Sequence, residues 1–501
     1  MQLRPYQEKA IQAANEHWGE WNKELLVLPT GTGKTIIFNE IARNKSRDGR
    51  VLILAHRDEL IEQARDKYDG VTGKIKAQEN DIQPITVGSV QTMCRREYDP
   101  SLFQTVIVDE AHHAISDSYQ AVLNQFPDAK VLGVTATPDR GDKKSLAKYF
   151  EGIAYEYKLR QAVEDGYLVR PIARCIPLEI DMSGVKVRVG DFEVNSIAEA
   201  LEPYLPEIAK QIALYAADRK TVVFCPLISI AQEFCEYLNE AGIEAREVNG
   251  ESADRKETLK WFDEAGKGTA LCNAMLLTEG WDCPSADCIV VLRPTKVRSL
   301  YTQMVGRILR LAPDKEDALI LDFLWLSQKH DLCRPAFLIS DNSEDREYVK
   351  KASEDAEIDL FDIESDAVEA RRNALAEALA AQKRKKAKLV DPLQWFVSTG
   401  EMALEDYQPF AAWEYEPVSE KQKAILEKFG INPTGIDTKG KASLMIDRAI
   451  ARKKQGLATP KQIRCLERYG YERVGEWSFE AANKKISQLS ANGWKRNWRT
   501  G

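Results

Sequence analysis

The amino-acid sequence predicts an α/β protein with two doubly wound parallel-sheet domains, followed by a mostly α-helical C-terminal region. Short apolar runs recur in two groups, without polar alternation and with helical stretches between them. Such runs are typical of parallel strands buried on both faces. A glycine-rich segment joins one of these strands to an apolar helix, and a repeat of helical character closes the chain.

The chain has 501 residues, which is too long for a single hydrophobic core. We expect four segments along it. They are a first sheet domain over residues 1–157, a second over 158–330, a charged and partly helical linker over 331–417, and two tandem helical hairpins of about 40 residues each over 418–501.

The predicted strands fall into one group for each sheet. In the first domain they are Leu25–Leu28, Val51–Ala55, Ile85–Val87, Val106–Val108 and Val131–Thr135. In the second domain they are Thr221–Cys225, Ala245–Asn249, Thr269–Asn273, Cys288–Leu292 and Ala318–Asp322. The stretches between consecutive runs have helical character, so the pattern favours strand–helix–strand units in both domains.

The composition is that of a globular protein without a membrane segment. Hydrophobic residues make up 44% of the chain, and no apolar run reaches the roughly 18–20 residues that a transmembrane helix needs. The N-terminus lacks the apolar core of a secretion signal, so we expect a cytoplasmic protein in a bacterial or phage-infected cell. The nine cysteines are scattered without a C-x-x-C pair, which predicts reduced thiols and no zinc.

The linker is strongly charged. Residues Glu344–Asp366 are acidic and weakly apolar, whereas Glu369–Lys388 is rich in Ala, Glu, Lys and Arg and predicts an exposed helix. Its basic end, Lys383–Lys388, fits either a nucleic-acid contact or a solvated helix end, where cations are favourable anyway.

The last segment contains a repeat with an offset of 40 residues. The matched positions are Lys421-Gln422 with Lys461-Gln462, Leu426-Glu427 with Leu466-Glu467, Phe429-Gly430 with Tyr469-Gly470, Ala442 with Ala482, and Ile446 with Ile486. Each unit predicts a helix, a glycine stop, a short loop and a second helix that begins after Thr438 or Ser478 as N-cap.

Positive charge is concentrated in this repeat. Residues 418–501 contain 18 Lys and Arg against 8 Asp and Glu, a net charge of +10, so residues 1–417 carry −18 of the overall −8. Trp494 and Trp498 interleave with basic residues. We interpret the repeats as a nucleic-acid-binding module. The alternatives are a purely structural module and a docking site for a protein, for example one of recombination or replication.

The glycine-rich segment Pro29–Thr35 (PTGTGKT) follows an apolar strand and precedes an apolar helix. Gly31 and Gly33 let the backbone N–H groups of Thr30–Thr35 face phosphate oxygens, and the helix N-terminus adds a positive dipole. Lys34 is placed to reach the β- and γ-phosphates of ATP, and Thr35 to hold Mg²⁺. ATP and Mg²⁺ are therefore the predicted ligands.

Two carboxylates follow another predicted strand, in the segment Val106–Glu110. At a strand end Asp109 can bind Mg²⁺, usually through water. Glu110 can then polarise the water that attacks the γ-phosphate, because phosphoryl transfer needs mainly positioning and charge neutralisation. Farther along the chain, Arg307 and Arg310 lie three residues apart on a predicted helix and so share one face, with Gln303 one turn earlier.

Seven segments in this order resemble the motif series of superfamily 2 helicases and translocases. They are PTGTGKT (29–35), LAHRDEL (54–60), VGSVQT (87–92), DEAH (109–112), TATP (135–138), TEGWDCP (278–284) and QMVGRILR (303–310). The stretch 276–310 is most similar to the RadD-like branch, which is related to the XPB helicase and to type I and type III restriction motors. The resemblance covers about residues 1–325 and implies two RecA-like domains. The cysteine cluster that RadD-like proteins carry after the motor is absent.

The resemblance also implies roles for single residues. Arg307 and Arg310 match arginine fingers, which cross from the second domain to the γ-phosphate, and Gln303 faces the same cleft. His112 matches a residue that couples the nucleotide to the domain interface. Thr135 and Thr137 match the element that links ATP to strand binding.

Three further sets of residues are implied in the same way. The segment Leu3–Gln7 resembles an adenine-binding element, in which Gln7 pairs with the base and Arg4 or Tyr6 stacks on it. Gly280 and Asp282 match positions near the ribose and the domain interface. Sequence-independent contacts to nucleic acid are implied for His56, Arg57, Gln91, Thr92 and Thr278.

From these patterns we expect an ATP-dependent DNA helicase or translocase that acts in recombination, repair or phage replication. Its track is expected to be single-stranded, duplex or branched DNA. One alternative is a duplex translocase that does not separate strands. Another is a nucleic-acid-binding adaptor with a slow ATPase, and an RNA helicase is the least favoured.

Overall fold

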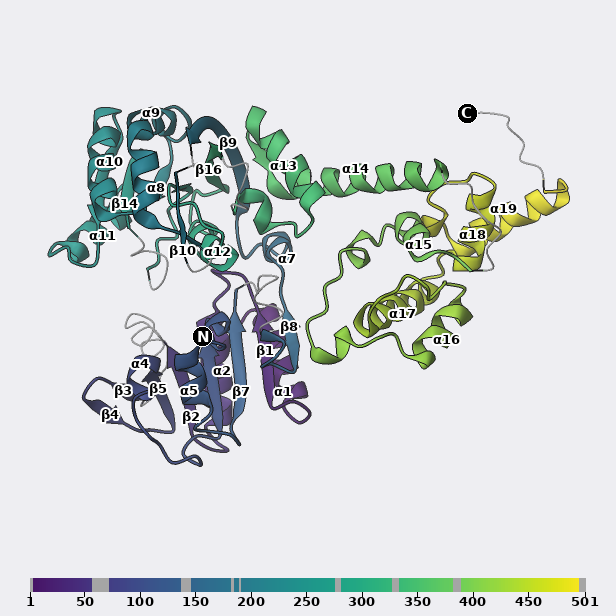
Figure 1. Ribbon diagram of the computed structural model, residues 1–501, viewed down its shortest axis with the longest axis horizontal. Coiled ribbons are helices and arrows are strands. Elements are labelled where there is room, and N and C mark those ends of the chain that lie inside the picture. Colours follow the sequence, from purple (N-terminus) through teal and green to yellow (C-terminus); the bar gives the residue numbers. More distant parts are fainter. Residues whose placement is uncertain are drawn as a thin grey trace. The chain divides into compact units, whose positions relative to one another are not determined.

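The computed structural model describes residues 3–55, 72–136, 146–181, 184–188, 191–274, 281–326, 333–381 and 389–494. It contains two compact units. The first comprises residues 1–340 and 346–364, and the second comprises residues 341–345 and 365–501. Both predicted parallel sheets lie in the first unit, and helices dominate the second, which confirms the predicted fold class (Figure 1).

The N-terminal sheet has eight strands. In order across the sheet they are β4 (Glu79–Asp81), β3 (Gly73–Lys76), β5 (Ile85–Ser89), β2 (Val51–Ala55), β6 (Thr105–Asp109), β7 (Lys130–Thr135), β1 (Lys23–Val27) and β8 (Gly152–Glu156). Neighbouring strands pair in parallel, except that β4 is antiparallel to β3. Since parallel strands end at one edge, the segments after β1, β5, β6 and β7 meet at that edge.

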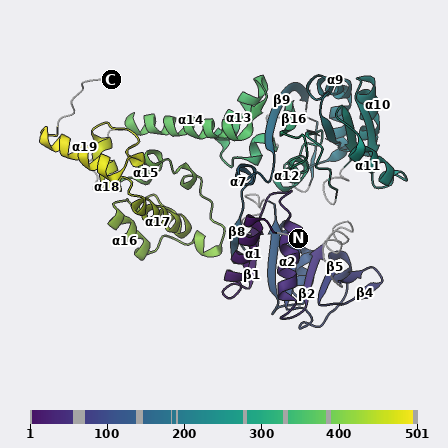
Figure 2. The same ribbon diagram turned by 180° about the vertical axis from the view of Figure 1, so that it is seen from behind.

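Helices cover this sheet. They are α1 (Pro5–His17), α2 (Lys34–Lys45), α4 (Val90–Met93), η1 (Ala111–His113) and α5 (Asp117–Leu123). The short helix α7 (Leu159–Glu164) lies in the connector that follows β8. The helix α1 packs beside β8 and β1, as the reverse view in Figure 2 shows. All five strands predicted for this domain are present and differ from the prediction by at most two residues at an end.

The second sheet has seven strands. In order they are β13 (Glu244–Val248), β14 (Thr269–Asn273), β12 (Lys220–Phe224), β15 (Cys288–Val291), β16 (Asp317–Leu326), β9 (Arg170–Asp181) and β17 (Ile358–Asp359). Only β17 is antiparallel to its neighbour among these strands. The five predicted strands form one continuous block from β13 to β16, and the sequence patterns did not indicate β9 or β17.

The helices of this domain are α8 (Val194–Leu201), η2 (Glu202–Tyr204), α9 (Leu205–Tyr215), α10 (Ile228–Glu240), α11 (Arg255–Glu264), α12 (Arg298–Gly306), η4 (Pro335–Leu338) and α13 (Ser343–Asp355). A small hairpin of β10 (Val187–Arg188) and β11 (Asp191–Phe192) precedes them. The helix α10 packs on β13, on β14 and on α9. Their buried apolar side chains form one core, with Phe234 and Val223 fully buried.

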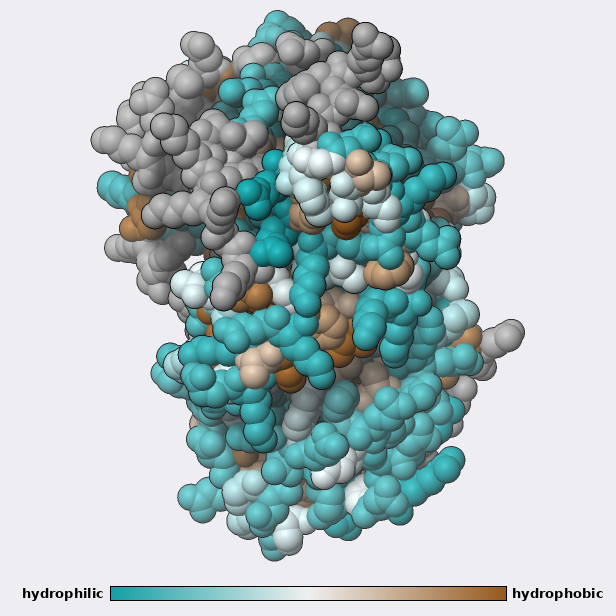
Figure 3. All heavy atoms as spheres, turned by 90° about the vertical axis from the view of Figure 1, so that its right-hand side faces the viewer, coloured by the Kyte–Doolittle hydropathy of each residue, from teal (hydrophilic) through white to brown (hydrophobic). Residues whose placement is uncertain are grey.

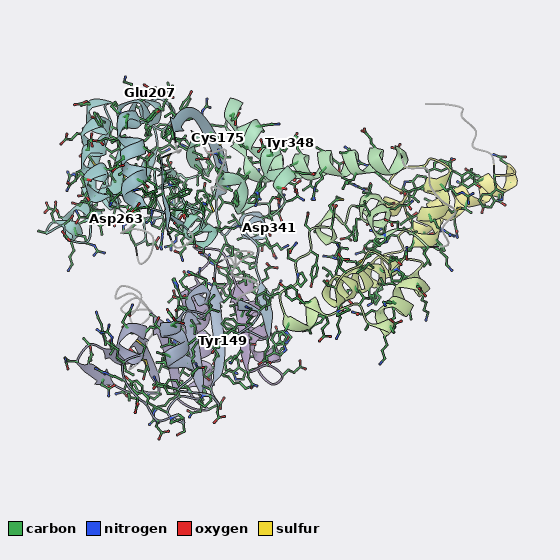
Figure 4. All side chains as sticks on the ribbon, viewed as in Figure 1. Tyr149, Cys175, Glu207, Asp263, Asp341 and Tyr348 are labelled. Atoms are coloured by element: carbon green, nitrogen blue, oxygen red, sulfur yellow. The ribbon has the colours of Figure 1, made fainter. Side chains whose placement is uncertain are left out.

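Residues that follow the second domain in sequence complete its sheet. Cys175 on β9, labelled in Figure 4, accepts a hydrogen bond of 2.9 Å from the Ser353 hydroxyl on α13. Arg170, at the start of β9, forms an ion pair of 2.7 Å with Asp359 on β17. The stretch 346–364, predicted as part of a linker, therefore belongs to the packed structure around β9.

The predicted exposed helix at Glu369–Lys388 corresponds to α14 (Leu360–Ala381), but two of its residues contradict the prediction. Arg371 and Arg372 are each only 7% exposed. The Arg371 guanidinium lies 2.6 Å from Asp406 and 3.1 Å from Asp345. A guanidinium surrounded by carboxylates can be buried without an uncompensated charge. Residues Lys383–Lys388 lie outside the described residues.

The second unit is built from α15 (Pro392–Thr399), α16 (Glu420–Phe429), α17 (Lys439–Lys454), α18 (Pro460–Arg468) and α19 (Phe479–Ala491), with short 3₁₀ turns η5 (Met402–Leu404), η6 (Ala412–Tyr415) and η7 (Val474–Glu476). The pairs α16–α17 and α18–α19 are the two predicted hairpins. Trp395 on α15 and Leu426 and Leu466 on the hairpins share one buried core.

The ends of the repeated helices agree with the prediction. Thr438 and Ser478 accept hydrogen bonds from the backbone N–H groups of Lys441 and Ala481, so both are N-caps. Gly430, which ends α16, has φ +90°, a conformation that favours glycine. Among the described residues, none of the helices combines the length and apolarity needed to span a membrane.

Candidate nucleotide-binding site

The glycine-rich segment forms a tight loop between β1 and α2. Gly31 and Gly33 have φ of +90° and +77°, and Gly33 immediately precedes the first residue of α2, Lys34. The Thr32 hydroxyl donates a 2.7 Å hydrogen bond to the carbonyl of Pro29 and closes the loop. This is the strand–loop–helix geometry that binds phosphate, because N–H groups and the helix dipole converge on the anion.

The N-terminal helix is tied to this loop. The Gln7 amide N–H donates to the carbonyl of Thr32 at 3.3 Å, and its Oε1 accepts from the backbone of Arg4 at 2.9 Å. The Tyr6 hydroxyl donates to the same Thr32 carbonyl at 2.5 Å, and its ring stacks on Tyr157 with a centroid distance of 4.5 Å. Gln7 and Tyr6 are therefore engaged within the protein. Arg4 is exposed, and its guanidinium lies 5.0 Å from the centroid of the Tyr167 ring. Adenine contact by Gln7 and Arg4 stays a prediction.

Glu110 lies at the centre of the charged groups. Its carboxylate is 3.9 Å from the Lys34 ammonium and 3.5 Å from Nδ1 of His112. Burial by itself raises the pKa of Glu110, but the positive charge of Lys34, and then of His112, His113 and Arg307, outweighs this effect and leaves the pKa below its usual value. Glu110 is therefore ionised at neutral pH and can orient a water molecule.

The backbone at Glu110 is unusual. Its φ is +51°, which is uncommon for a residue with a side chain. The Glu110 N–H donates to the neighbouring Asp109 carboxylate at 3.0 Å, and η1 begins at the next residue. The turn directs Asp109 and Glu110 differently from two successive residues of a strand, so the pair can serve two ligands.

The arginine segment corrects one prediction. Helix α12 ends at Gly306, so Arg307 and Arg310 do not share the face of a helix. The chain instead pairs with the segment after α7, where the backbone N–H of Val169 donates to the carbonyl of Leu309 at 2.9 Å and Arg310 forms a bridge with Leu168. Pairing with a neighbouring strand-like segment satisfies these backbone groups in place of a further helical turn.

The two arginines have defined partners. Arg307 is 8% exposed and donates through Nη1 to the carbonyl of Trp281 at 2.7 Å. Arg310 forms an ion pair with Asp282, and burial lowers the pKa of Arg310 to about 10. Gln303 is buried on α12. The sequence did not reveal the Arg310–Asp282 pair, because the resemblance placed Asp282 near the ribose and the domain interface without indicating its partner.

The two sheet domains meet at the phosphate loop within the first unit. A Cβ atom on Gly31 would lie 3.1 Å from Cγ of Arg310 and 3.1 Å from Cδ2 of Leu168, and one on Gly306 would overlap the Thr30 side chain. Arginine segment and loop are thus in van der Waals contact. Leu168, like Tyr157 and Tyr167, was missed by sequence reasoning, because only Gly166 marks this connector as a turn and nothing indicates its partners.

The remaining ATP-site residues lie at the edge where the strands end. Thr35 is the second residue of α2, which packs against β6, and Asp109 ends β6. A hydroxyl and a carboxylate are oxygen ligands of the kind that Mg²⁺ prefers, and Mg²⁺ keeps several waters. Thr135 is fully buried at the end of β7, and its carbonyl accepts from the N–H of Leu28, directly before the phosphate loop.

Only part of the predicted nucleic-acid interface can be located. Gln91 and Thr92 follow β5 on the short helix α4, and Thr92 accepts a hydrogen bond of 3.0 Å from the backbone of Ala77. Five predicted residues lie outside the described residues, namely His56, Arg57, Thr137, Thr278 and Gly280.

Comparison with known proteins agrees with this geometry. The family model described as "Type III restriction enzyme, res subunit" matches residues 1–140, and that described as "Helicase conserved C-terminal domain" matches residues 204–312. These two matches cover the phosphate loop and Glu110 on one side and the arginines on the other. The chain belongs to superfamily 2 of the helicases.

Individual relatives are similar over the same region. The putative ATP-dependent helicase IRC3 of Saccharomyces cerevisiae is 31% identical over 385 residues, which are 70% of this chain and 56% of that protein. The putative mitochondrial ATP-dependent helicase irc3 of Schizosaccharomyces pombe is 33% identical over 64% of this chain and 57% of that protein. The chain thus spans a little over half the length of these two relatives.

A solved structure shares the fold. The fragment of a putative HsdR subunit of a type I restriction enzyme from Vibrio vulnificus YJ016 is 25% identical, with a TM-score of 0.52 over 64% of each chain. The matched share of this chain corresponds to about the length of the two sheet domains.

Proposed function

We propose that this protein is an ATP-dependent DNA helicase or translocase that uses Mg²⁺. The observation that carries the proposal is that positively charged side chains from both sheet domains act on the Glu110 carboxylate. This carboxylate lies 3.9 Å from Lys34, and its pKa is lowered by Lys34 on one domain and by Arg307 on the other. A carboxylate between two cations from different domains suits a hydrolysis site that works only when the domains are together.

Each group of residues has a separate role in the transfer of the γ-phosphate to water. The N–H groups of the loop and Lys34 bind the β- and γ-phosphates, and the Glu110 carboxylate orients the attacking water. Arg307 and Arg310 stabilise the negative charge on the γ-phosphate. Thr35 and Asp109 would hold Mg²⁺, and the ion would supply positive charge that offsets the charge of the phosphate oxygens.

The Arg310–Asp282 ion pair must break before Arg310 can take part in this reaction. Arg310 can neutralise phosphate charge only after its guanidinium leaves Asp282, and Asp282 is then free to contact the ribose. We infer that closure of the two domains on ATP exchanges one partner of Arg310 for the other. Hydrolysis would then respond to anything that shifts this exchange, including DNA bound at the strand ends near Gln91 and Thr92.

We favour DNA over RNA because one relative, from Sulfurisphaera tokodaii, is described as a DNA 3'-5' translocase and another protein as a restriction-enzyme subunit. We further propose that the DNA is an intermediate of recombination, repair or phage replication. The similarity to a type I restriction subunit also favours a second candidate, a motor that moves along duplex without separating strands.

The test is the steady-state ATPase rate without nucleic acid and with single-stranded DNA, duplex DNA, a forked junction and RNA. We expect stimulation by one form of DNA, and loss of hydrolysis with retained ATP binding in Glu110→Gln. The matched control is Glu16→Gln, which removes an exposed carboxylate of the same domain. Wild-type turnover by Glu110→Gln would contradict the site, and stimulation by RNA alone would contradict the choice of DNA.

Strand-displacement and triplex-displacement assays on the same preparation separate the two motor candidates. Release of a strand from a fork indicates a helicase. Triplex displacement without release of a strand from the fork indicates the duplex translocase.

A further inference from the structure

The first helices of the two C-terminal repeats, α16 and α18, carry cations at the same positions. Lys421 corresponds to Lys461, and Lys428 corresponds to Arg468, and all four are exposed. Within each helix the two cations are seven residues apart, which is nearly two turns, so they lie on one side at a spacing of about 10 Å.

These four cations have no acidic partner among the described residues. The contrast is with basic residues that lack a basic counterpart in the other repeat. Lys423 is paired with Glu420 at 2.8 Å, and Lys439 is paired with Glu416 at 2.7 Å. The four cations at equivalent positions are thus left available to an external anion.

Glu427 and Glu467, which directly precede Lys428 and Arg468, are also equivalent, and each lies about 100° around the helix from the cation that follows it. The side chains on the same side as the cations, three and four residues after the first one, carry no negative charge. Ala424 and Ile425 lie between the cations of α16, and Arg464 and Cys465 lie between those of α18. Burial raises the pKa of the Cys465 thiol, and the positive charges of Arg464 and Arg468 oppose this shift. The resulting surface is cationic with small and apolar residues between the charges.

Both repeats hold this surface on the same support. The Gln422 amide N–H donates to the carbonyl of Lys439 at 2.9 Å and to the Ser443 hydroxyl at 2.8 Å. At the equivalent place, Gln462 donates to the carbonyl of Phe479 at 3.0 Å and to the Asn483 side chain at 3.1 Å. The first helix is therefore fixed to the second in one way in both repeats, and the equivalent cations are presented alike.

The two cationic pairs are adjacent. A Cβ atom on Gly430, which ends α16, would lie 3.3 Å from Cγ of Lys461 at the start of α18. The end of α16 that carries Lys428 therefore lies against the beginning of α18. Figure 3 shows a mostly hydrophilic surface with scattered hydrophobic residues.

We propose that the two repeats form one tandem binding site for the phosphodiester backbone of nucleic acid, to which each repeat contributes the same pair of phosphate contacts. Lysine and arginine on a helix surface contact phosphate without reading bases, so this binding is independent of sequence. The proposal does not depend on the ATPase, because the repeats would bind without nucleotide.

The experiment measures binding of the full-length protein, without nucleotide, to a labelled single strand and to a labelled duplex over a range of salt concentrations. One variant combines Lys421→Ala with Lys428→Ala, a second combines Lys461→Ala with Arg468→Ala, and a third carries all four substitutions. Counterion release predicts that each pair lowers the slope of log affinity against log salt by about 1.4 on the single strand and about 1.8 on the duplex.

Between 1 M and about 0.1 M salt, the affinity of a variant that lacks one pair is expected to rise roughly 25-fold to 60-fold less than the affinity of the wild type. The two pairs should contribute equally, and the fourfold variant should lose the sum of both slopes. The control combines Lys423→Ala with Lys439→Ala, which removes the same charge from paired positions and should leave the slope unchanged. Circular dichroism checks that every variant is folded, as expected for substitutions at the surface.

Three results would overturn the proposal. If the fourfold variant has the same salt slope as the control, the four residues do not contact phosphate. If only one of the two pairs changes the slope, the two repeats are not equivalent. If both paired variants lose binding to labelled polyglutamate to an equal extent but keep their binding to nucleic acid, the partner is an acidic protein. A Lys34→Ala variant that hydrolyses no ATP but keeps the wild-type slope separates this site from the motor.

Discussion

Glu24 provides a quantitative test of the strand that leads into the phosphate loop. Its side chain lies on β1, is 2% exposed, and neither carboxylate oxygen has a hydrogen-bond partner among the described residues. Burial raises its pKa from 4.5 to about 8, although Lys45 and Lys130 oppose the shift. The folded protein therefore holds Glu24 protonated at neutral pH, and we expect Glu24→Gln to replace a neutral group with another of the same shape.

The sign and size of the effect follow from the two pKa values. Between pH 4.5 and about 8 the folded chain keeps a proton that the unfolded chain releases, so stability falls as the pH rises through this window. Each unit of pKa difference corresponds to about 1.4 kcal/mol, so the loss approaches roughly 5 kcal/mol above the folded pKa. Glu24→Gln abolishes this loss.

Thermal unfolding of wild type and Glu24→Gln, near pH 5.5 and near pH 9, measures the effect. At pH 5.5, one unit above the unfolded pKa, the wild type has lost about 1.4 kcal/mol. We therefore expect the midpoint of the variant to exceed that of wild type by a small margin at the lower pH and by a margin several times larger at the higher pH, at roughly 2–4 °C for each kcal/mol. Glu156→Gln is the control, because Glu156 is exposed on the neighbouring strand β8. A difference between wild type and Glu24→Gln that is the same at both pH values would refute the reasoning.

Three further substitutions test the site and the repeats. Asp282→Asn should free Arg310 and raise the ATPase rate without DNA, whereas a higher KM for ATP at unchanged kcat would mean that Asp282 serves mainly the ribose. Gly306→Ala places a Cβ atom against Thr30 and should separate the arginine segment from the phosphate loop. We expect a lower kcat with little change in the thermal midpoint. An unchanged kcat would show that hydrolysis does not depend on this contact. Gln462→Ala should destabilise the second unit by about 1–2 kcal/mol in denaturant unfolding, because it leaves buried backbone groups without their partner, and no change would show that the cap is dispensable.

The sequence could predict the parts of the site that depend on local chemistry. The run from Leu25 to Thr35 combines an apolar strand, two glycines and a lysine, and each is required at its place by the loop itself. The same holds for the repeats, where Thr438 and Ser478 cap helices through their own hydroxyl groups. Local signals of this kind survive folding because their partners are only a few residues away.

Long-range partners could not be predicted in this way. Arg307 and Arg310 have helical spacing, but the chain leaves the helix because Leu309 pairs with Val169, far away in sequence. The burial of Arg371 depends on Asp345 and Asp406, whose proximity is a product of the tertiary fold. In each case a distant contact decided the outcome.

The short strand β17 sets where an autonomous motor fragment can end. A fragment that stops near residue 330, at the apparent end of the helicase motifs, would lack β17 and the helix that donates Ser353 to Cys175. Strand β9 would then be an unprotected sheet edge, which invites pairing with other chains and aggregation. A soluble two-domain motor therefore needs the chain through Glu364, where the first unit ends. If shorter fragments are insoluble, the cause would be the exposed edge of β9 and not a defect in the ATP site.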